Sequence, residues 1–346
     1  MPARPQPLPT QLESGPFAVS RDGAHGVSRG RLRASDIARP HRGVAVAQAA
    51  FQTLQERAAA ALLFVGPNAW VSHSTAVLIA GLPLPRRLET GPIHVAAVPP
   101  RAAPRARGII GHRLNLRDHE RDVLHATGLN REWTELRAVA APRALLTVAS
   151  ELRLPDLIAV VDALRFRTSD TDRTLADSGE RGWGNSQSWD DNRLAQEMGR
   201  LFAEHTGSRG LVALKSAWKA SRLGVRSRPE SLLRTALCAA RLPEPVVGHT
   251  IFGAGWTATP DLAWPQWNVL VEYEGEHHRT SKRQFEHDLE RFERYIDEGW
   301  RPIRVLRPDL FHNPVPMLYR VADRLRSAGW RPRRHWALRP VPAFLP

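Results

Sequence analysis

The chain has 346 residues, 42% of them hydrophobic and 24% charged, which is ordinary for a globular protein and leaves room for two or three domains. Its formal net charge of +14 indicates a nucleic acid or another anionic partner, and its single cysteine excludes an intrachain disulfide and a cysteine-rich zinc site. The first residues lack the apolar core of a signal peptide, and no apolar run approaches the roughly 18 residues that span a membrane, so we expect a cytoplasmic protein without a membrane segment.

The N-terminal half alternates short elements with turn-rich connections. Residues 1–16 are rich in proline and are expected to be disordered. The stretch SHSTAVLIAG predicts a helix of about two turns that ends at Gly81. Further elements are predicted as a short helix at 26–35, a turn into a strand at 38–46, a helix at 48–64, strands at 93–98 and 108–116, and helices at 142–152, 155–166, 191–205 and 210–222. A polar loop is expected at 167–190.

The C-terminal unit begins near Ser227. Glu230 follows three residues later and an apolar run comes next, which is the pattern of a helix capping box. The remaining pattern predicts two strands between 246 and 265, a strand at 268–275, an amphipathic helix, and a strand at 302–307. The apolar stripe of that helix is expected to be Phe285, Leu289, Phe292 and Ile296. We therefore expect an α+β N-terminal region and a C-terminal α/β fold whose central mixed sheet is flanked by helices.

Acidic residues gather in one segment of this basic chain. Residues 261–300 hold ten acidic and five basic residues, a net charge of −5, so the rest of the chain carries +19. Glu272 and Glu274 are two apart in a strand and share one face, and a hairpin can bring Asp261 beside Glu272. Three carboxylates on one face repel unless a cation lies between them, and oxygen ligands suit Mg²⁺ or Mn²⁺. The acids of the helix that follows are more simply interpreted as a solvated face.

The same segment resembles the PD-(D/E)XK nuclease superfamily, with Pro260 and Asp261 as the PD pair and Glu272-Tyr273-Glu274 at the (D/E)XK position. It is similar in particular to the branch related to very-short-patch-repair endonucleases. Over about 225–320 the matches to that branch are Glu272, Tyr273, Gly275, His278, Asp288, Arg291, Gly299, Trp300, Arg304 and Val305. The lysine of the wider superfamily is replaced by Glu274, which leaves open an inactive nuclease fold.

The resemblance implies roles for the residues it matches. Asp261 and Glu272 are expected to bind the metal, and Glu274 to complete the ligand set directly or through water. Glu230 would reach the site from the first helix, or would only cap that helix. Two residues of the following segment have alternatives: His278 would be a general base or phosphate contact, or a surface turn residue, and Arg291 would border the site or form a surface salt bridge with Asp288. Lys282 is a weaker candidate for a nucleic-acid contact.

The N-terminal region carries a second, weaker resemblance over roughly 20–170. GVSRGRLRASDIARPHRGVAV and SHSTAVLIAGLPLP resemble the start and the middle of the type IV abortive-infection antitoxin family, whose start is a degenerate winged helix. The resemblance implies a DNA-binding or regulatory role. The phosphate contacts it suggests are Arg29, Arg31, Arg33, Arg39 and Arg42, although arginines that are merely solvated are an equal alternative.

Together these patterns predict a cytoplasmic, Mg²⁺- or Mn²⁺-dependent DNA endonuclease with an N-terminal DNA-binding module. The alternatives are a non-catalytic DNA-binding regulator of antitoxin type, and a protein that acts on RNA. The domain plan is a disordered 1–16, a winged-helix-like 17–64, an antitoxin-like 65–170, a linker with helices at 171–225, a nuclease-like 226–325 and a basic tail at 326–346. The tail alternates arginines with Trp330 and Trp336, which suits nucleic acid or a packed terminal strap.

Overall fold

The structure of the protein is a computed structural model that describes residues 6–13, 15–19, 26–51, 53–125, 135–166, 191–275 and 282–344. It divides into two compact units whose sequences interleave. Unit 1 comprises Met1–Leu152 and Asp170–Leu214, and unit 2 comprises Arg153–Ser169 and Lys215–Pro346. The chain therefore leaves unit 1, starts unit 2, returns to unit 1 and then completes unit 2. Among the described residues, every helix is too short or too polar to cross a bilayer.

Unit 1 opens with a small three-stranded antiparallel sheet of order β1-β3-β2, preceded by the short helix α1 (Thr10–Glu13). Its strands are β1 (Phe17–Ala18), β2 (Ile37–His41) and β3 (Val44–Ala47), so the turn at 38–46 forms as predicted. The helix predicted at 26–35 is wrong, because only one 3₁₀ turn, Arg31–Arg33, forms there. Glycine explains the difference, since Gly26 takes φ of +79° and Gly30 precedes the turn.

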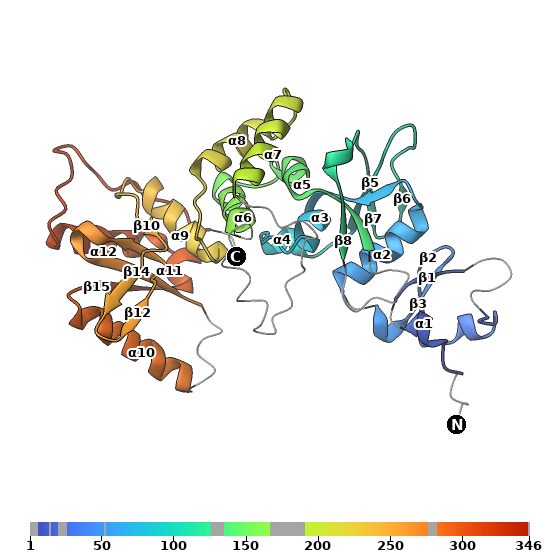
Figure 1. Ribbon diagram of the computed structural model, residues 1–346, viewed down its shortest axis with the longest axis horizontal. Coiled ribbons are helices and arrows are strands. Elements are labelled where there is room, and N and C mark those ends of the chain that lie inside the picture. Colours follow the sequence, from blue (N-terminus) through green and yellow to red (C-terminus); the bar gives the residue numbers. More distant parts are fainter. Residues whose placement is uncertain are drawn as a thin grey trace. The chain divides into compact units, whose positions relative to one another are not determined.

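The larger sheet of unit 1 has six strands in the order β6-β7-β5-β4-β9-β8 and is mixed, since β5–β7 and β4–β9 are parallel pairs (Figure 1). Its strands are β4 (Ala69–Val71), β5 (Ile93–Ala97), β6 (Arg105–Ala106), β7 (Ile109–Arg113), β8 (Arg121–His125) and β9 (Glu135–Val139). The accompanying helices are α2 (Leu54–Val65), α3 (His73–Ile79), α4 (Arg86–Glu89), α5 (Ala141–Val148) and α7 (Asp191–Glu204), with 3₁₀ turns at Gln48–Ala50 and Asp118–Glu120. The predicted helix after Ser72 is confirmed as α3, and α2 contacts strands of both sheets.

Unit 2 is built on a four-stranded sheet of order β10-β13-β14-β15. Only β14–β15 is parallel, so the helix between these strands forms a crossover connection. The strands are β10 (Val246–Val247), β13 (Leu262–Trp264), β14 (Val269–Glu274) and β15 (Arg301–Leu306), with a separate hairpin of β11 (Ile251–Gly253) and β12 (Trp256–Ala258). The helices are α6 (Leu154–Phe166), α9 (Arg228–Ala239), α10 (Lys282–Asp297), α11 (Arg307–Phe311) and α12 (Pro314–Ser327); α8 (Leu211–Ala220) lies where the two units meet in the sequence, and Pro265–Trp267 forms a 3₁₀ turn. The α/β class with a mixed sheet flanked by helices is thus confirmed.

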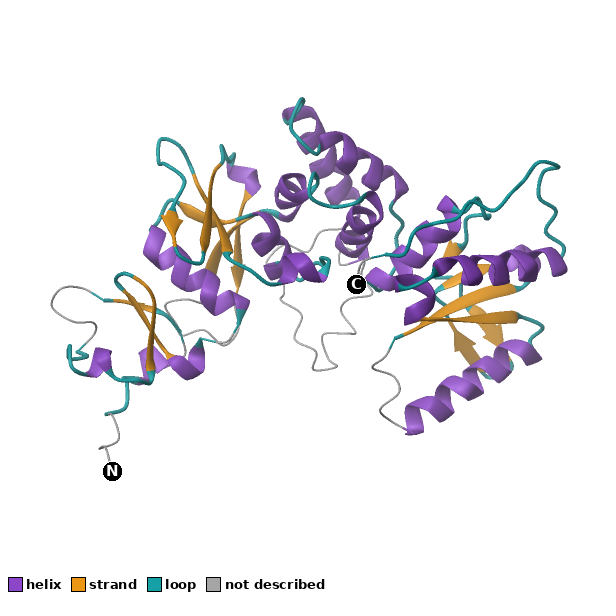
Figure 2. Ribbon diagram, turned by 180° about the vertical axis from the view of Figure 1, so that it is seen from behind, coloured by secondary structure: helices purple, strands orange, loops and turns teal. Residues whose placement is uncertain are grey.

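Helices cover both faces of this sheet, with α9 and α12 on one side and α10 on the other (Figures 1 and 2). The first face buries Val271 and Trp264 against α9 and α12, and the second buries Leu270 and Ala263 against Tyr295 of α10. The C-terminal segment packs onto the first core, because Trp330 is 9% exposed and meets the ring of Trp336 edge-on at 5.0 Å. The terminal tail is therefore a packed strap in the part that the structure describes.

Candidate functional site

The predicted acidic residues meet at the end of β14. In the β13–β14 hairpin Leu262 pairs with Val271, so Asp261, one residue earlier, lies opposite Glu272 on the same face of the sheet. One carboxylate oxygen of Asp261 accepts the backbone N–H of Tyr273 at 2.7 Å. The hairpin therefore holds Asp261 and Glu272 side by side on the face covered by α10.

Glu272 is only 7% exposed, and both of its carboxylate oxygens accept hydrogen bonds from α10. Its Oε1 accepts the hydroxyl of Tyr295 at 2.8 Å, and its Oε2 accepts the guanidinium of Arg291 at 3.0 Å. Burial is the main reason that the pKa of Tyr295 is raised, and the neighbouring Glu272 raises that pKa further. Helix α10 thus supplies a neutral donor and a positive charge to this carboxylate.

Glu274 lies two residues further along β14 and pairs with the next strand instead. The Nε of Arg304 on β15 is 3.1 Å from a carboxylate oxygen of Glu274. The same guanidinium lies over the ring of Phe292, 4.4 Å from its centroid, which is the geometry of a cation–π contact. Glu272 and Glu274 therefore share a face, as predicted, but each has an arginine of its own.

Glu230 approaches the site from the first turn of α9. Its carboxylate accepts the hydroxyl of Ser227 at 2.8 Å and the backbone N–H of Arg226 at 2.9 Å, so it does cap the helix. It also acts on the acidic residues of the sheet. Burial raises the pKa of Asp261 to about 7, and the charge of Glu230 adds to that rise. Burial is the main cause that raises the pKa of Glu230, and the charge of Glu272 raises it further.

The four carboxylates are neighbours without forming a preformed metal cage. In the described part of the chain, two groups of three ligand-type side chains have their ligand atoms within 4.8 Å of one another, and neither group includes Asp261, Glu272, Glu274 or Glu230. His278 and its neighbour His277 lie outside the described residues. The side chains of Lys282 and Asp288 also lie outside the described part, although both residues belong to α10.

Helix α10 departs from the predicted apolar stripe at Ile296. Ile296 was expected to be buried but is 58% exposed, whereas Tyr295 is fully buried. The carboxylate of Glu272 explains the departure, because Tyr295 and Arg291 both face β14 where they reach it. Arg291 thus borders the acidic site, as one of the two predicted alternatives had it, whereas its predicted pairing with Asp288 involves a side chain outside the described residues.

The N-terminal arginines differ in their surroundings. Arg31 is tied to Asp36 by two hydrogen bonds of 2.7 Å, so its guanidinium is already engaged by a carboxylate. Arg29, Arg33, Arg39 and Arg42 are exposed. A phosphate backbone could reach these four, whereas contact with Arg31 would compete with the Asp36 pair.

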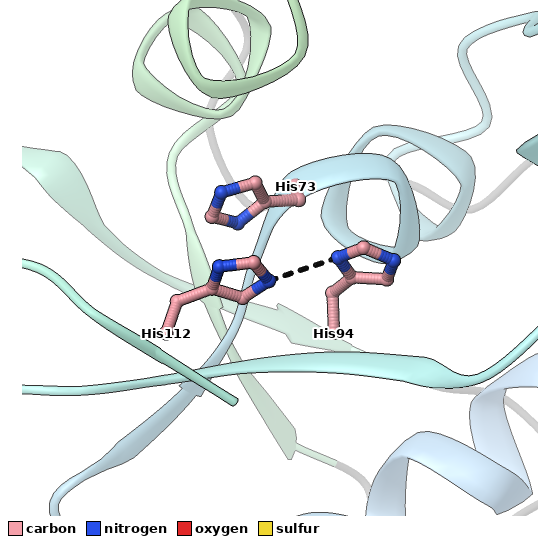
Figure 3. Close-up of side chains that lie close together, drawn as sticks. All are labelled: His73, His94 and His112. Atoms are coloured by element: carbon pink, nitrogen blue, oxygen red, sulfur yellow. Dashed lines mark hydrogen bonds between the residues drawn. The ribbon is translucent and has the colours of Figure 1, made fainter. Parts of the chain in front are cut away.

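Sequence reasoning missed a group of three histidines in unit 1. His73, His94 and His112 come from α3, β5 and β7, and their rings gather on one side of the six-stranded sheet (Figure 3). Burial is the main cause that lowers the pKa of all three, to about 3 for His73 and about 4 for His112. Their spacing of 21 and 18 residues matches no short motif, so only the fold brings them together.

The second ligand-type group is His119, Glu120 and Glu204, and protein donors already surround its buried member. Glu120 is 2% exposed and accepts the backbone N–H of Arg117 at 3.0 Å, while His205 and Arg143 also lie against its carboxylate. Burial alone would raise the pKa of Glu120, but these donors together lower it. We interpret this group as a compensated structural carboxylate.

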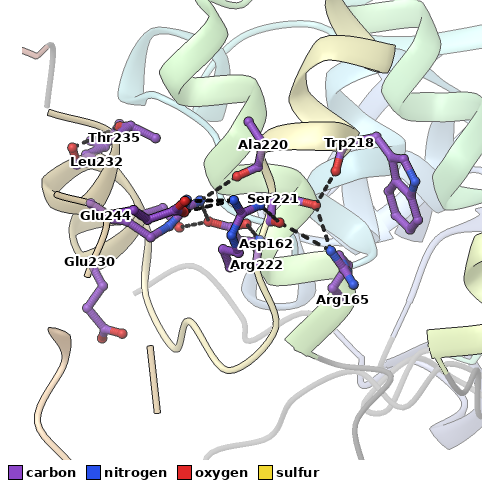
Figure 4. A network of polar contacts seen from close by, with 12 residues as sticks. Asp162, Arg165, Trp218, Ala220, Ser221, Arg222, Glu230, Leu232, Thr235 and Glu244 are labelled. Atoms are coloured by element: carbon purple, nitrogen blue, oxygen red, sulfur yellow. Dashed lines mark hydrogen bonds and ion pairs between the residues drawn. The ribbon is translucent and has the colours of Figure 1, made fainter. Parts of the chain in front are cut away.

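Sequence reasoning also missed a buried ionic network that joins α6 to α9 in unit 2 (Figure 4). Asp162 is fully buried and accepts the backbone N–H of Arg222 at 2.6 Å, the hydroxyl of Ser231 at 2.8 Å and the guanidinium of Arg234 at 3.0 Å. Burial nevertheless raises the pKa of Asp162. Glu230 points away from this network (Figure 4). One face of α9 therefore contacts the network, while its first turn lies at the acidic site.

Comparison with known proteins gives similarity without a described activity. Two curated proteins of Mycobacterium tuberculosis, from strains CDC 1551 / Oshkosh and H37Rv, are each 28% identical to this chain over 139 residues, and both are described only as uncharacterized proteins. The matched part covers 38% of this chain, and the chain spans about half the length of these relatives. No family model matches the chain, and no solved structure matches it.

Proposed function

We propose that unit 2 is a Mg²⁺- or Mn²⁺-dependent phosphodiester hydrolase of the endonuclease type that acts on DNA. The observation that carries the proposal is the convergence of two buried carboxylates, Glu272 and Glu230, and the half-buried Asp261 at the end of β14. They come from three separate elements of a strongly basic chain. Such a cluster is costly unless positive charge enters it, and burial, with the charge of Glu230 second, raises the pKa of Asp261.

The donor set fits a hard divalent cation in its chemistry. All four side chains offer carboxylate oxygens, which are the ligands that Mg²⁺ and Mn²⁺ prefer, and among the described residues no arginine forms an ion pair with Asp261 or Glu230. A bound Mg²⁺ would orient a phosphate and neutralise charge that develops during hydrolysis. Asp261, Glu272 and Glu230 would hold the ion. Arg291, which now pairs with Glu272, would then be placed to contact a phosphate oxygen.

One observation favours a second function: the carboxylates of Glu272 and Glu274 are already paired with protein donors. Tyr295 and Arg291 take both oxygens of Glu272, and Arg304 pairs with Glu274. In that arrangement the arginines supply the compensating charge. The unit would then be a non-catalytic platform in a DNA-binding regulator, and the exposed N-terminal arginines would supply phosphate contacts.

A cleavage assay separates these two functions. Plasmid, single-stranded DNA and RNA are incubated with the protein in Mg²⁺, Mn²⁺ or EDTA, beside Asp261→Asn and Glu272→Gln. The hydrolase predicts cutting that needs the metal and disappears in both variants, while DNA affinity measured by fluorescence anisotropy is kept or rises because negative charge is removed. Glu290→Gln, an exposed carboxyl on α10, is the matched control and should cut like the wild type. Salt-sensitive DNA binding without cutting on any substrate would favour the regulator.

A further inference from the structure

The three histidines of unit 1 form a cluster set by the register of the sheet. Strands β5 and β7 are parallel, and Ala96 pairs with His112 while His94 lies two residues before Ala96. Side chains two apart in a strand face the same side, so His94 and His112 are diagonal neighbours on one face. His73 begins α3 above that face, and its ring stacks on His112 with centroids 3.5 Å apart (Figure 3).

The backbone of His73 has an uncommon conformation. Its φ is +50°, in the left-handed region, although it is not glycine. Such a conformation is strained for most residues other than glycine and is found often at functional positions. The preceding Ser72 is fully buried, and its hydroxyl lies 3.1 Å from Nδ1 of His73. That contact leaves Nε2 of His73 as the nitrogen that faces away from its own backbone.

The ring nitrogens are spaced for a shared ligand. Nδ1 of His94 and Nε2 of His112 are 3.0 Å apart, and one nitrogen from each ring of the trio lies within 4.8 Å of the others. In a tetrahedral zinc site with Zn–N of about 2.05 Å, neighbouring nitrogens are roughly 3.3 Å apart. Nε2 of His73 has no protein hydrogen-bond partner among the described residues, and Nδ1 of His94 and Nε2 of His112 are hydrogen-bonded to each other.

The chemistry of the trio selects one class of ligand. The rings are half-buried, and a neutral imidazole keeps one lone-pair nitrogen. Three such nitrogens suit zinc-like transition metals and not the hard Mg²⁺ ion. The charges that act on the rings are of both signs, with Arg143 near His73 and Glu151 near His94, so the surroundings do not repel a cation strongly.

We infer that His73, His94 and His112 form a binding site for a zinc-like divalent transition metal in unit 1. Each ring supplies one nitrogen, and the fourth position faces the half-exposed side of the cluster. On binding, the contact between His94 and His112 is exchanged for two bonds to the metal. Ser72 acts behind His73 and fixes which nitrogen of that ring is presented.

The test is Zn²⁺ binding to the full-length, tag-free, chelator-treated protein, followed by isothermal titration calorimetry and by the absorption spectrum of the Co²⁺ form. We expect one Zn²⁺ per chain, a tetrahedral Co²⁺ spectrum and no competition from Mg²⁺. His94→Gln and His112→Gln should each weaken Zn²⁺ binding by at least about 10–100-fold, because even partners behind a ligand contribute that much. His73→Asn should do the same while tolerating the left-handed backbone.

Two controls locate the site. His119→Gln removes a member of the other ligand-type group, and His249→Gln removes a half-buried histidine that packs on Trp300 in unit 2. Both should bind Zn²⁺ like the wild type. The inference is overturned if the wild type takes up no Zn²⁺ at stoichiometric concentration, if the trio variants that fold by circular dichroism bind normally, or if His119→Gln abolishes binding. A variant that does not fold leaves the remaining variants and the wild-type Co²⁺ spectrum to decide.

Discussion

Tyr295→Phe tests whether the acidic site of unit 2 is stabilised by its hydrogen bonds. The substitution removes only the hydroxyl that donates to Glu272 at 2.8 Å. Tyr295 is fully buried and Glu272 is 7% exposed, so water cannot replace the lost donor easily. A hydrogen bond to a charged group contributes about 1.5–3 kcal/mol. We expect the free energy of unfolding to fall by that amount, which lowers the folded-to-unfolded ratio roughly 10- to 150-fold.

The measurement is urea unfolding followed by tryptophan fluorescence, to which Trp256 contributes beside Tyr295. Tyr319→Phe is the matched control, because Tyr319 is 51% exposed on α12 and should change stability by less than about 0.5 kcal/mol. Equal effects of the two substitutions would refute the reasoning. The same variant bears on the proposed function: if Glu272 binds Mn²⁺, losing a competing donor should increase the stabilisation that Mn²⁺ gives.

Three further perturbations test other parts of the fold. Asp162→Ala should lower the free energy of unfolding, measured in urea, by about 3–5 kcal/mol because it removes the carboxylate that pairs with the buried Arg234. A loss below about 1 kcal/mol would contradict the importance of that pair. The donors around Glu120 lower its pKa below the usual 4.5, so the unfolded chain binds a proton at this carboxylate before the folded protein does. The free energy of unfolding should therefore begin to fall as the pH drops below about 4.5. Glu120→Gln should flatten this pH dependence, and Glu135→Gln, at an exposed position, should not. Thr53→Ala removes the cap of α2, in which the Thr53 hydroxyl accepts the N–H of Glu56 at 3.2 Å, and should lower the melting temperature through a loss of about 1 kcal/mol, while Thr53→Ser should not.

Much of unit 2 could be predicted because its signals are local. The capping pattern at Ser227, the alternation along β14 and the strand character of β15 are properties of contiguous residues, and the structure confirms each. The position of Asp261 beside Glu272 followed from hairpin geometry in the same way. These elements needed no knowledge of distant partners.

The errors and omissions have a common physical origin. Ile296 fits an apolar stripe by spacing, but the carboxylate of Glu272 turns α10 so that Tyr295 is buried instead. Periodicity counts apolar residues and cannot weigh a buried polar partner on another element. The histidine trio depends on the parallel pairing of β5 with β7, which no short spacing reveals. Sequence patterns therefore located the candidate carboxylates and placed Arg291 beside them, but they did not predict the ion pairs of Glu272 with Arg291 and of Glu274 with Arg304.

The interleaving of the two units has a consequence for synthesis on the ribosome. Asp162 of α6 leaves the ribosome 72 residues before Arg234, the cation that it meets in the core of unit 2. At about 5–20 residues per second, translation leaves that carboxylate without its partner for roughly 4–14 s. Unit 2 cannot close its core during this interval, although α7 of unit 1 is being made. A fragment that begins at residue 215 would meet the converse problem permanently, because it would bury Arg234 without the acid that balances it.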